Sequence, residues 1–349
     1  MSEPVAPRPC EAQQPGILLV GLNDDASVSS YLGSAAEARG MDVRFFCSDR
    51  GYSSNRILRS FGHRFLGGYP SRGGPFNNAI TECLASSRPG FLLTTGKAPV
   101  FRATLDAARR MGVRTVNYST DDPWNNKHAA GWFDRALASY DVVATPRSKT
   151  MPDFQRLGVR KVVHVPFGYC PHAHRAAVDI EESSAAGDVF FAGGCDSDRI
   201  PFFEALVAAS LRPVLFGGYW ERCASLRPFH HGFIPVSEMA VMHARTPVSV
   251  CLVRRANRDE HVMRTFEAAA MGACLVMEDS GEHRELFGPD GESVVYFSDP
   301  STLVAACQRV LADVGLRQRL RISARQKVIG GHNSYGDRLD QMLATASDT

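Results

Sequence analysis

The sequence lacks an apolar run long enough to cross a bilayer. A transmembrane helix needs about 20 consecutive apolar residues, and no stretch of the chain approaches that length. Nothing at the start resembles a secretory signal either. Residues 1–15 contain four prolines and no apolar core, so we expect them to form a disordered leader. These absences predict a protein without a membrane span, and they leave peripheral attachment open.

The sequence also lacks an excess of either charge and any close pair of cysteines. Lys and Arg number 39 against 37 Asp and Glu, a net charge of +2. A nearly neutral surface creates no strong field for nucleic acid or anionic lipid, and it suits an enzyme that acts on small molecules. The nine cysteines form no C-x-x-C pair. We therefore expect reduced, mostly buried thiols in a cytoplasmic protein.

Two common nucleotide-binding motifs are missing. The first expected strand, 17–22, runs into Asn23, Asp24 and Asp25 rather than into G-x-G-x-x-G, so the dinucleotide fingerprint is absent. The strand 91–95 is followed by Gly-Lys-Ala. The spacing there is one residue too long for a P-loop, and Ala98 stands where that motif needs Ser or Thr.

Strands alternate with helical segments along most of the chain. This alternation is typical of doubly wound parallel sheets, and 349 residues suit two domains of about 150 each. Further strands are expected at 42–47, 114–119, 142–145, 161–166, 188–192, 214–218, 248–253 and 273–277. We expect a first domain at 16–168, a linker at 169–187, a second domain at 188–331 and a terminal amphipathic helix at 332–349.

The stretch 248–297 carries most of the chemistry. A strand opens into a loop rich in Arg, Asn, Asp and His, a short helix at 263–271 follows and Gly272 ends it, and a second strand opens into a polar loop at 278–285. In open α/β sheets, loops at the carboxyl ends of strands line the ligand crevice. The pattern therefore predicts a binding site here.

Glu267 is the one charged residue between Thr265 and Met277. A buried carboxylate needs hydrogen-bond donors, because an unpaired buried charge costs several kcal/mol; sugar hydroxyls are suitable donors. The alternative is a solvated helix face, on which Glu267 pairs with Arg264 three residues earlier and contributes only a few tenths of a kcal/mol. The residue pattern leaves both alternatives open.

Other polar residues follow the expected strands. Lys97 lies where a cation can meet a phosphate or a sugar carboxylate, or it is a solvated lysine. Asp121 and Asp122 are candidates for a catalytic base or an acceptor contact, and capping or turn formation is the alternative. Gly193 and Gly194 would let backbone amides approach a diphosphate, and Arg199 would grip it, unless the segment is a simple tight turn. His172 and His174 have a metal-like spacing, but no third ligand is evident.

Long segments of the chain resemble one known family. The string RRANRDEHVMRTFEAAAMGACLV (254–276) is similar to the signature of CgeB-like glycosyltransferases, a bacterial family of the GT-B fold. TTGKAP (94–99), YSTDDPW (118–124), VPFGYCPHAH (165–174), DVFFAGGCDSDR (188–199), LFGGYWER (215–222) and HNSYGDRL (332–339) match it in order. The chain departs from the family at Cys170, where members often carry Asp, which puts a charge-based role at that position in doubt.

The resemblance implies two Rossmann-like domains that face each other across a cleft, with the C-terminal helix crossing back to the first. The second domain would bind a nucleotide diphosphate sugar, with Glu267 on the ribose and Arg199, Arg264 and the amides near Gly193 and Gly281 on the diphosphate. Asp259 precedes Glu267 by eight residues, the paired-acid spacing of retaining GT-B transferases. Such enzymes do not generally need a metal, and no cofactor is expected beyond the sugar nucleotide.

The resemblance also places Glu282 and His283 near the transferred sugar; they are equally plausible as helix-starting residues that bind no ligand. The expected activity is transfer of a sugar to an unidentified acceptor. Two alternatives stay open: a GT-B epimerase or hydrolase that acts on the same donor, and a non-catalytic protein that binds sugar nucleotides.

Overall fold

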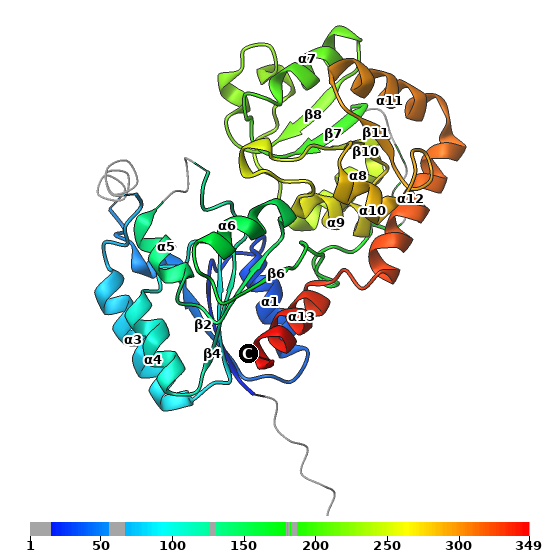
Figure 1. Ribbon diagram of the computed structural model, residues 1–349. Coiled ribbons are helices and arrows are strands. Elements are labelled where there is room, and N and C mark those ends of the chain that lie inside the picture. Colours follow the sequence, from blue (N-terminus) through cyan, green and yellow to red (C-terminus); the bar gives the residue numbers. More distant parts are fainter. Residues whose placement is uncertain are drawn as a thin grey trace, which may run out of the picture.

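Two parallel β-sheets with helices packed against them form the two lobes of the molecule, one above the other in Figure 1. The computed structural model describes residues 15–55, 67–125, 130–178, 180, 182 and 187–348. Almost the whole of the expected leader, residues 1–14, lies outside the described residues. The expected domain boundaries stay a prediction.

The first sheet has the strand order β2-β1-β3-β4-β5-β6, and every pair in it is parallel. Its strands are β1 Ile17–Gly21, β2 Val43–Cys47, β3 Phe91–Thr95, β4 Arg114–Tyr118, β5 Val142–Thr145 and β6 Lys161–His164. The helices of this lobe are α1 Val28–Glu37, α3 Gly73–Ser87, α4 Arg102–Arg110, α5 Gly131–Leu137 and α6 Met151–Arg156. All residues of β1 and β5 are buried, because helices pack on both faces of a parallel sheet.

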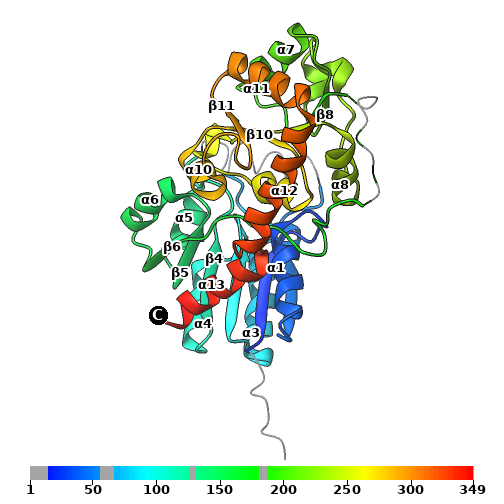
Figure 2. The same cartoon turned by 90° about the vertical axis from the view of Figure 1, so that its right-hand side faces the viewer.

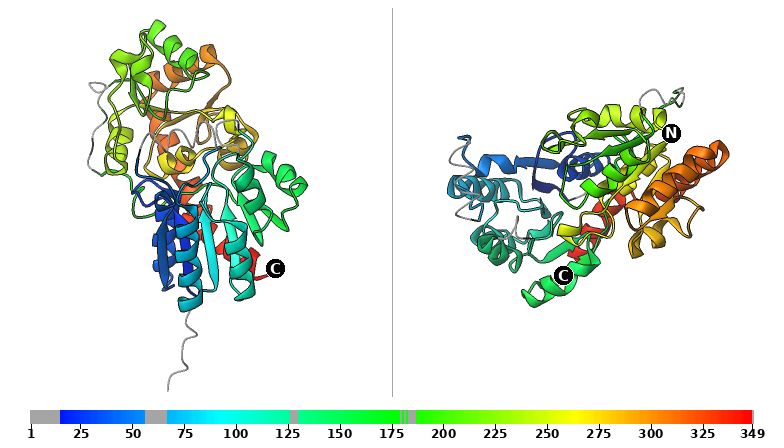
Figure 3. Two further views of the ribbon diagram at one scale, coloured as in Figure 1. Left: turned by 90° about the vertical axis from the view of Figure 1, so that its left-hand side faces the viewer. Right: turned by 90° about the horizontal axis from the view of Figure 1, so that it is seen from above.

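The second sheet has the order β11-β10-β9-β7-β8 and is also parallel throughout. Its strands are β7 Val189–Ala192, β8 Pro213–Phe216, β9 Val248–Cys251, β10 Leu275–Glu278 and β11 Val295–Phe297. Its helices are α7 Ile200–Ala208, α8 Val236–Arg245, α9 Met263–Ala270, α10 Gly281–Phe287, α11 Pro300–Ala312 and α12 Val314–Gly330. Seen from above, the orange α11 and α12 lie on one side of this lobe (Figure 3).

The last helix, α13 Tyr335–Ser347, returns to the first lobe and packs beside α1 (Figure 2). Ser334 caps it, because its hydroxyl accepts from the Asp337 amide while the Asp337 carboxylate accepts from the Ser334 amide. Tyr335, Leu339 and Met342 are fully buried against the first sheet. The expected pair of doubly wound sheets and the crossing terminal helix are thus confirmed.

One hydrophobic core runs through both lobes. It joins the α1 side of the first sheet to α9, β10 and α13, with members such as Leu19, Phe266 and Leu339. A second core lies on the opposite face of the first sheet, and a third on the opposite face of the second sheet. The lobes therefore share apolar packing where the chain crosses between them.

Capping side chains start new helices inside two stretches of the second lobe. The stretch after Pro300 is divided into α11 and α12 at Asp313, whose backbone is extended and whose carboxylate accepts from the Leu316 amide to start α12. The polar loop expected at 278–285 is shorter, because Ser280 caps a helix that begins at Gly281. In both cases a capping side chain starts a new helix inside a segment of mixed polarity.

Candidate functional site

A pocket of about 400 Å³ lies between the two lobes, at the carboxyl ends of the strands. We call it the interlobe pocket. It sits at β7 and β9, the point where the strand order of the second sheet reverses and where open α/β sheets bind ligands. The first lobe supplies Ala26, Thr120, Asp121, Arg147 and Phe167; the second supplies residues of 190–199, 243, 249–254, 257–268 and 275.

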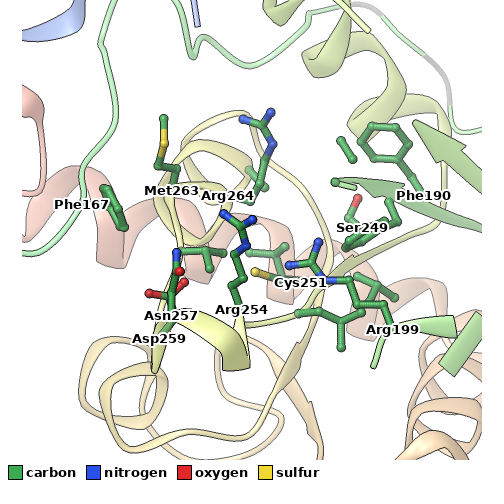
Figure 4. Close-up of a pocket in the computed structure, with 18 of the residues that line it drawn as sticks. Phe167, Phe190, Arg199, Ser249, Cys251, Arg254, Asn257, Asp259, Met263 and Arg264 are labelled. Atoms are coloured by element: carbon green, nitrogen blue, oxygen red, sulfur yellow. The ribbon is translucent and has the colours of Figure 1, made fainter. Parts of the chain in front are cut away.

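Three arginines line the middle of the interlobe pocket. Arg254 lies centrally, between Arg199 and Arg264, as Figure 4 shows. The Arg199 guanidinium is held by the Gly194 carbonyl at 3.0 Å. Within the described structure, the Nε atoms of Arg199 and Arg264 are buried without a hydrogen-bond partner. Buried donors without acceptors are costly, and an anion between these arginines would satisfy them.

The loop after β7 approaches the pocket through its backbone. Gly193 lines the pocket, and its carbonyl accepts from the Trp220 indole at 2.8 Å. Gly217, with φ +123°, packs directly on the Gly193 backbone, where a Cβ would collide with the Gly193 carbonyl oxygen. Only glycine fits this combination of backbone angle and close approach. Gly194 lies next to the pocket and outside its lining.

The amino end of α9 faces the same space. Val262, Met263 and Arg264, at the start of this helix, all line the pocket. The first amides of a helix lack partners within the helix and carry the positive end of its dipole. The middle of the pocket thus combines three guanidinium groups with a helix amino terminus, the arrangement that binds phosphate groups.

Carboxylates lie toward the first lobe. Asp259 is ion-paired with Arg147, and both side chains are 3% exposed. Arg147 also donates to the Thr120 carbonyl at 2.9 Å. Burial raises the pKa of Asp259 to about 6, although Arg147 acts in the opposite direction. Asn257 donates to the Asp121 carboxylate at 3.4 Å, so this end of the pocket presents both carboxylate and amide groups.

The opposite end of the pocket lies within the second lobe. Phe190, His243 and Ser249 line it, and the imidazole meets the Phe190 ring edge-on with centroids 4.8 Å apart. His243 Nδ1 hydrogen-bonds the Ser249 hydroxyl at 2.8 Å. Burial lowers the pKa of His243 to about 3, so the imidazole is neutral at physiological pH.

A second pocket of about 380 Å³ adjoins the first and belongs mainly to the first lobe. We call it the first-lobe pocket. It lies at β1 and β3, where the order of the first sheet reverses. Its lining includes Asp24, Asp49, Tyr52 and Lys97, together with residues shared with the interlobe pocket: Ala26, Thr120, Asp121, Phe167 and Met263. Burial lowers the pKa of Lys97, although the negative charge of Asp121 acts in the opposite direction.

Asp122 has different surroundings from Asp121. Its carboxylate is 2% exposed and accepts from Arg258 Nε at 2.6 Å and from Arg258 Nη2 at 2.9 Å, across the boundary between the lobes. The same guanidinium donates to Asp153 of α6 at 2.6 Å. Asp121 lines both pockets, whereas Asp122 lines neither of them. The placement therefore favours Asp121 as the residue that meets a ligand.

Glu267 lies on the buried face of α9 and is fully buried. Its Oε2 accepts from Arg264 Nη1, and its Oε1 lies 3.6 Å from His174 Nε2. The pair with Arg264 three residues earlier is thus present, but on a buried helix face and not on a solvated one. Glu267 is outside the lining of the interlobe pocket and touches it through Arg264.

The residues at the start of α10 also lie outside the interlobe lining. His283 is fully buried, bonded to Thr265 Oγ1 at 3.0 Å and to the Glu278 carbonyl at 2.7 Å. Burial lowers its pKa to about 4. Glu282 accepts from His261, and from Ser148 of the first lobe at 2.7 Å. Burial alone would raise the pKa of Glu282, but these contacts outweigh it and hold the value at about 2.

Gly281 opens α10, and its backbone lies close to the Glu260 carboxylate. The start of α10 therefore contacts both neighbours: His283 is hydrogen-bonded to Thr265 of α9, and Glu282 is hydrogen-bonded to Ser148 of the first lobe. Of the sequence-predicted residues, the interlobe pocket brings together Asp121, Gly193, Arg199, Asp259 and Arg264. Lys97 lines the adjoining pocket.

The pocket residues that sequence reasoning missed include Arg147, Arg254 and His243. Arg147 follows the well-predicted strand β5, so its position at a strand end was a usable signal. Arg254 opens the Arg-rich loop after β9, but the run of similar residues gave no reason to choose it. His243 lies in the last turn of α8, before β9 and not after the carboxyl end of a strand, and carried no signal.

Two searches of the described residues bear on metals and membranes. No group of three or more His, Cys, Asp or Glu side chains there is arranged to hold a metal ion. No helix within the described ranges has the length and apolarity that a membrane crossing requires. The eight cysteines in these ranges are all free thiols.

Comparisons with known proteins bear on the fold and on the second lobe. Residues 199–344 match the family described as "Glycosyl transferase-like". A sucrose-phosphate synthase from Thermosynechococcus elongatus superposes with a TM-score of 0.68 at 16% identity, over 96% of this chain and 99% of that one. A glycosyltransferase from Rickettsia africae gives 0.66 at 11% identity, with coverages of 96% and 98%.

The protein HepE from Anabaena, solved in complex with UDP-glucose, gives a TM-score of 0.62 at 11% identity, over 96% of this chain and all of that one. Among curated proteins, no sequence matches the chain. Likeness at these identities establishes a shared fold. The chain thus has the GT-B fold, and residues 199–344 are similar to the family described as glycosyl transferase-like.

Proposed function

We propose that this chain, a glycosyltransferase of the GT-B fold, is a CgeB-like cytoplasmic enzyme that moves a sugar from a nucleotide diphosphate sugar to a hydroxyl of an acceptor. One observation carries the proposal. Three arginines and the amino end of α9 converge on the middle of the interlobe pocket, and carboxylates lie at the end of this pocket that faces the first lobe. This sequence of groups matches the chemistry of a sugar nucleotide, which joins an anionic diphosphate to an uncharged polyol.

The arrangement supports one orientation of the donor. The diphosphate would lie among Arg199, Arg254 and Arg264, where the positive charge is concentrated. The transferred sugar would lie toward Asp259, Asn257 and Asp121, whose oxygens and amide hydrogen-bond hydroxyls. The nucleoside would lie at the Phe190 end, within the second lobe. The acceptor would enter from the first-lobe pocket, which meets the donor pocket at Asp121.

In the proposed reaction, an acceptor oxygen forms a bond to the anomeric carbon of the sugar while the bond from that carbon to the phosphate oxygen breaks. The leaving diphosphate takes the bonding electrons, and the arginines stabilise the charge that develops on it. The acceptor proton passes to Asp121 if the configuration inverts, or to the leaving phosphate if it is retained. Glu267 is proposed to act on the donor by holding Arg264.

The arginine cluster provides the first test. Arg254→Ala removes a central guanidinium whose side chain is 36% exposed, so the fold should tolerate the change. Hydrogen bonds to charged groups contribute about 1.5–3 kcal/mol, so we expect the affinity for the best nucleotide diphosphate sugar to fall by roughly 10- to 150-fold. Calorimetry with a panel that begins with UDP-glucose would measure it.

Arg309→Ala is the matched control, because Arg309 is an exposed arginine of the same lobe that pairs with Asp290 at 2.7 Å, away from the pocket. We expect it to bind nucleotides as the parent does. If no sugar nucleotide binds the parent protein, the proposed function is wrong. If donors bind but free sugar and nucleotide appear without any acceptor, the protein is a hydrolase of the same fold; binding without turnover would indicate a recognition protein.

A further inference from the structure

His243 lines the interlobe pocket, and within the described residues one of its ring nitrogens is buried without a hydrogen-bond partner. The residue is 3% exposed and belongs to the pocket lining. Its Nδ1 is held by Ser249 at 2.8 Å, and among the described residues no group hydrogen-bonds its Nε2. Leaving a buried polar nitrogen unpaired costs about 1–3 kcal/mol. A ligand that offers one hydrogen bond at this position would remove that cost.

The imidazole is fixed as well as unsatisfied. Ser249, in the middle of β9, holds Nδ1, and Phe190 of β7 meets the ring edge-on. Both neighbours belong to β7 and β9, which are adjacent, hydrogen-bonded strands inside the sheet. Because the imidazole is neutral at physiological pH, it offers directional hydrogen bonding and no charge. A neutral, fixed hydrogen-bonding group suits a flat uncharged ligand group better than it suits a phosphate.

The position of His243 along the pocket identifies the ligand part. The arginines occupy the middle of the pocket, and Asp259 and Asn257 lie at its end toward the first lobe (Figure 4). Phe190 and Ser249 lie on the other side of the arginines. Suppose that the diphosphate of the donor lies among the arginines and its sugar lies at the end toward the first lobe. The nucleoside of that donor then points toward His243.

We infer that His243 recognises the nucleobase of the donor, through a hydrogen bond from its ring edge to a polar atom of the base, and so sets the nucleotide preference of the enzyme. This inference rests on the proposed function, because it requires a nucleotide in the pocket. Ser249 positions the ring, and Phe190 packs against it. His243 is thus a specificity-determining residue, separate from the arginines that bind every nucleotide diphosphate alike.

The test compares nucleotide preference before and after the nitrogen is removed. His243→Phe keeps an aromatic ring beside Phe190 and deletes both ring nitrogens. The affinities of UDP, CDP, ADP, GDP and inorganic pyrophosphate are measured for the parent and the variant. We expect the ratio between the best and the next-best nucleotide to shrink by about tenfold, with the pyrophosphate affinity unchanged.

Ser249→Ala is the milder second variant, because it removes the partner of Nδ1 with little change in volume. It should reduce the same ratio in the same direction by a smaller factor, and it serves as the test if His243→Phe does not fold. Met239→Ala is the matched control: Met239 is a fully buried residue of α8 that packs on Met271 outside the pocket. It should lower stability and leave the nucleotide ratios unchanged.

Several results would overturn the inference. One is an unchanged nucleotide ratio in a folded His243→Phe or Ser249→Ala variant. Another is an equal loss of affinity for all nucleotides and for pyrophosphate, which would indicate general damage to the pocket. These outcomes differ from a failure of the proposed function itself, in which the parent protein binds no nucleotide at all.

Discussion

At the scale of single residues, Glu267 shows what burial does for an acidic side chain. It is the lone acid of an apolar segment, and it is fully buried. Yet its carboxylate faces Arg264 and His174, and Arg264 is the residue that reaches the pocket. A buried carboxylate that holds a guanidinium fixes the direction in which that guanidinium points.

A double-mutant cycle separates this positioning role from direct contact with the ribose. We expect Glu267→Gln to weaken nucleotide binding in the parent protein and to have almost no further effect when Arg264 is already Ala. The coupling energy should lie in the range of about 0.5–3 kcal/mol that is typical of residues in contact. Calorimetric titration of UDP into the four proteins measures it.

Additive losses in that cycle would contradict the positioning role and would favour a direct bond between Glu267 and the donor. Glu267→Gln should fold as the parent does, because Gln has nearly the volume of Glu. Circular dichroism of each variant checks this.

At the scale of elements, the two loops that follow β7 and β8 depend on each other. Gly217, at the end of β8, packs on the Gly193 backbone, which forms the wall of the pocket. The Gly217 amide also donates to the Gly232 carbonyl at 2.7 Å. The position of the loop after β7 is therefore set by the loop after β8 and its glycine.

Substitution at this contact should disturb both stability and binding. Gly217→Ala places a side chain at φ +123° and against the Gly193 carbonyl, so we expect a loss of about 2 kcal/mol or more in the free energy of unfolding. The affinity for UDP should fall in parallel. Chemical denaturation and calorimetry measure the two effects.

Gly218→Ala is the adjacent control. A Cβ at Gly218 would meet the Phe233 ring at 3.6 Å, an ordinary van der Waals distance. We expect it to change stability by less than about 0.5 kcal/mol. Equal effects of the two substitutions would show that the contact between the loops is unimportant.

Sequence patterns predicted the elements better than they predicted the site. Strands such as β3 and β5 were predicted with the observed bounds, because parallel strands buried on both faces appear as continuous apolar runs. The start of α10 was left as one of two alternatives, because the cap by Ser280 is a local hydrogen bond in a polar stretch. The Arg147–Asp259 pair joins residues 112 positions apart, and no local pattern indicates such a contact.

At the scale of the whole molecule, polar contacts join the two lobes around the pocket. Arg258 bonds Asp122 and Asp153, Lys149 pairs with Glu260 at 2.7 Å, and Ser148 bonds Glu282. Two of these three second-lobe partners, Arg258 and Glu260, lie in the loop that separates β9 from α9. This loop therefore both lines the pocket and attaches to the first lobe.

Removing the Arg258 contacts should loosen that attachment. Arg258→Ala leaves the Asp122 carboxylate, which is 2% exposed, without its guanidinium. Breaking a fully buried pair costs about 3–5 kcal/mol; because Arg258 is 37% exposed, we expect a smaller loss of about 1–3 kcal/mol. Small-angle scattering should show a larger radius of gyration, and chemical denaturation should show the lower stability.

The double variant Arg258→Ala with Asp122→Asn should recover part of the stability, because it removes the stranded charge. Arg284→Ala, which breaks an exposed pair with Asp279 inside the second lobe, should leave the radius of gyration at the parental value. A parental radius and stability in Arg258→Ala would rule out its role in holding the lobes together.

The return of α13 to the first lobe means that the polypeptide passes between the lobes twice. The outgoing pass after β6 and the returning pass before α13 touch each other through the bridge between Tyr169 and Ser334. Two adjacent covalent connections define an axis, so one lobe is restricted to rotation about that line and is prevented from twisting freely. Cleavage of a single pass would leave the halves tethered, and neither half could be excised without baring the apolar surface that Tyr335 and Leu339 now cover.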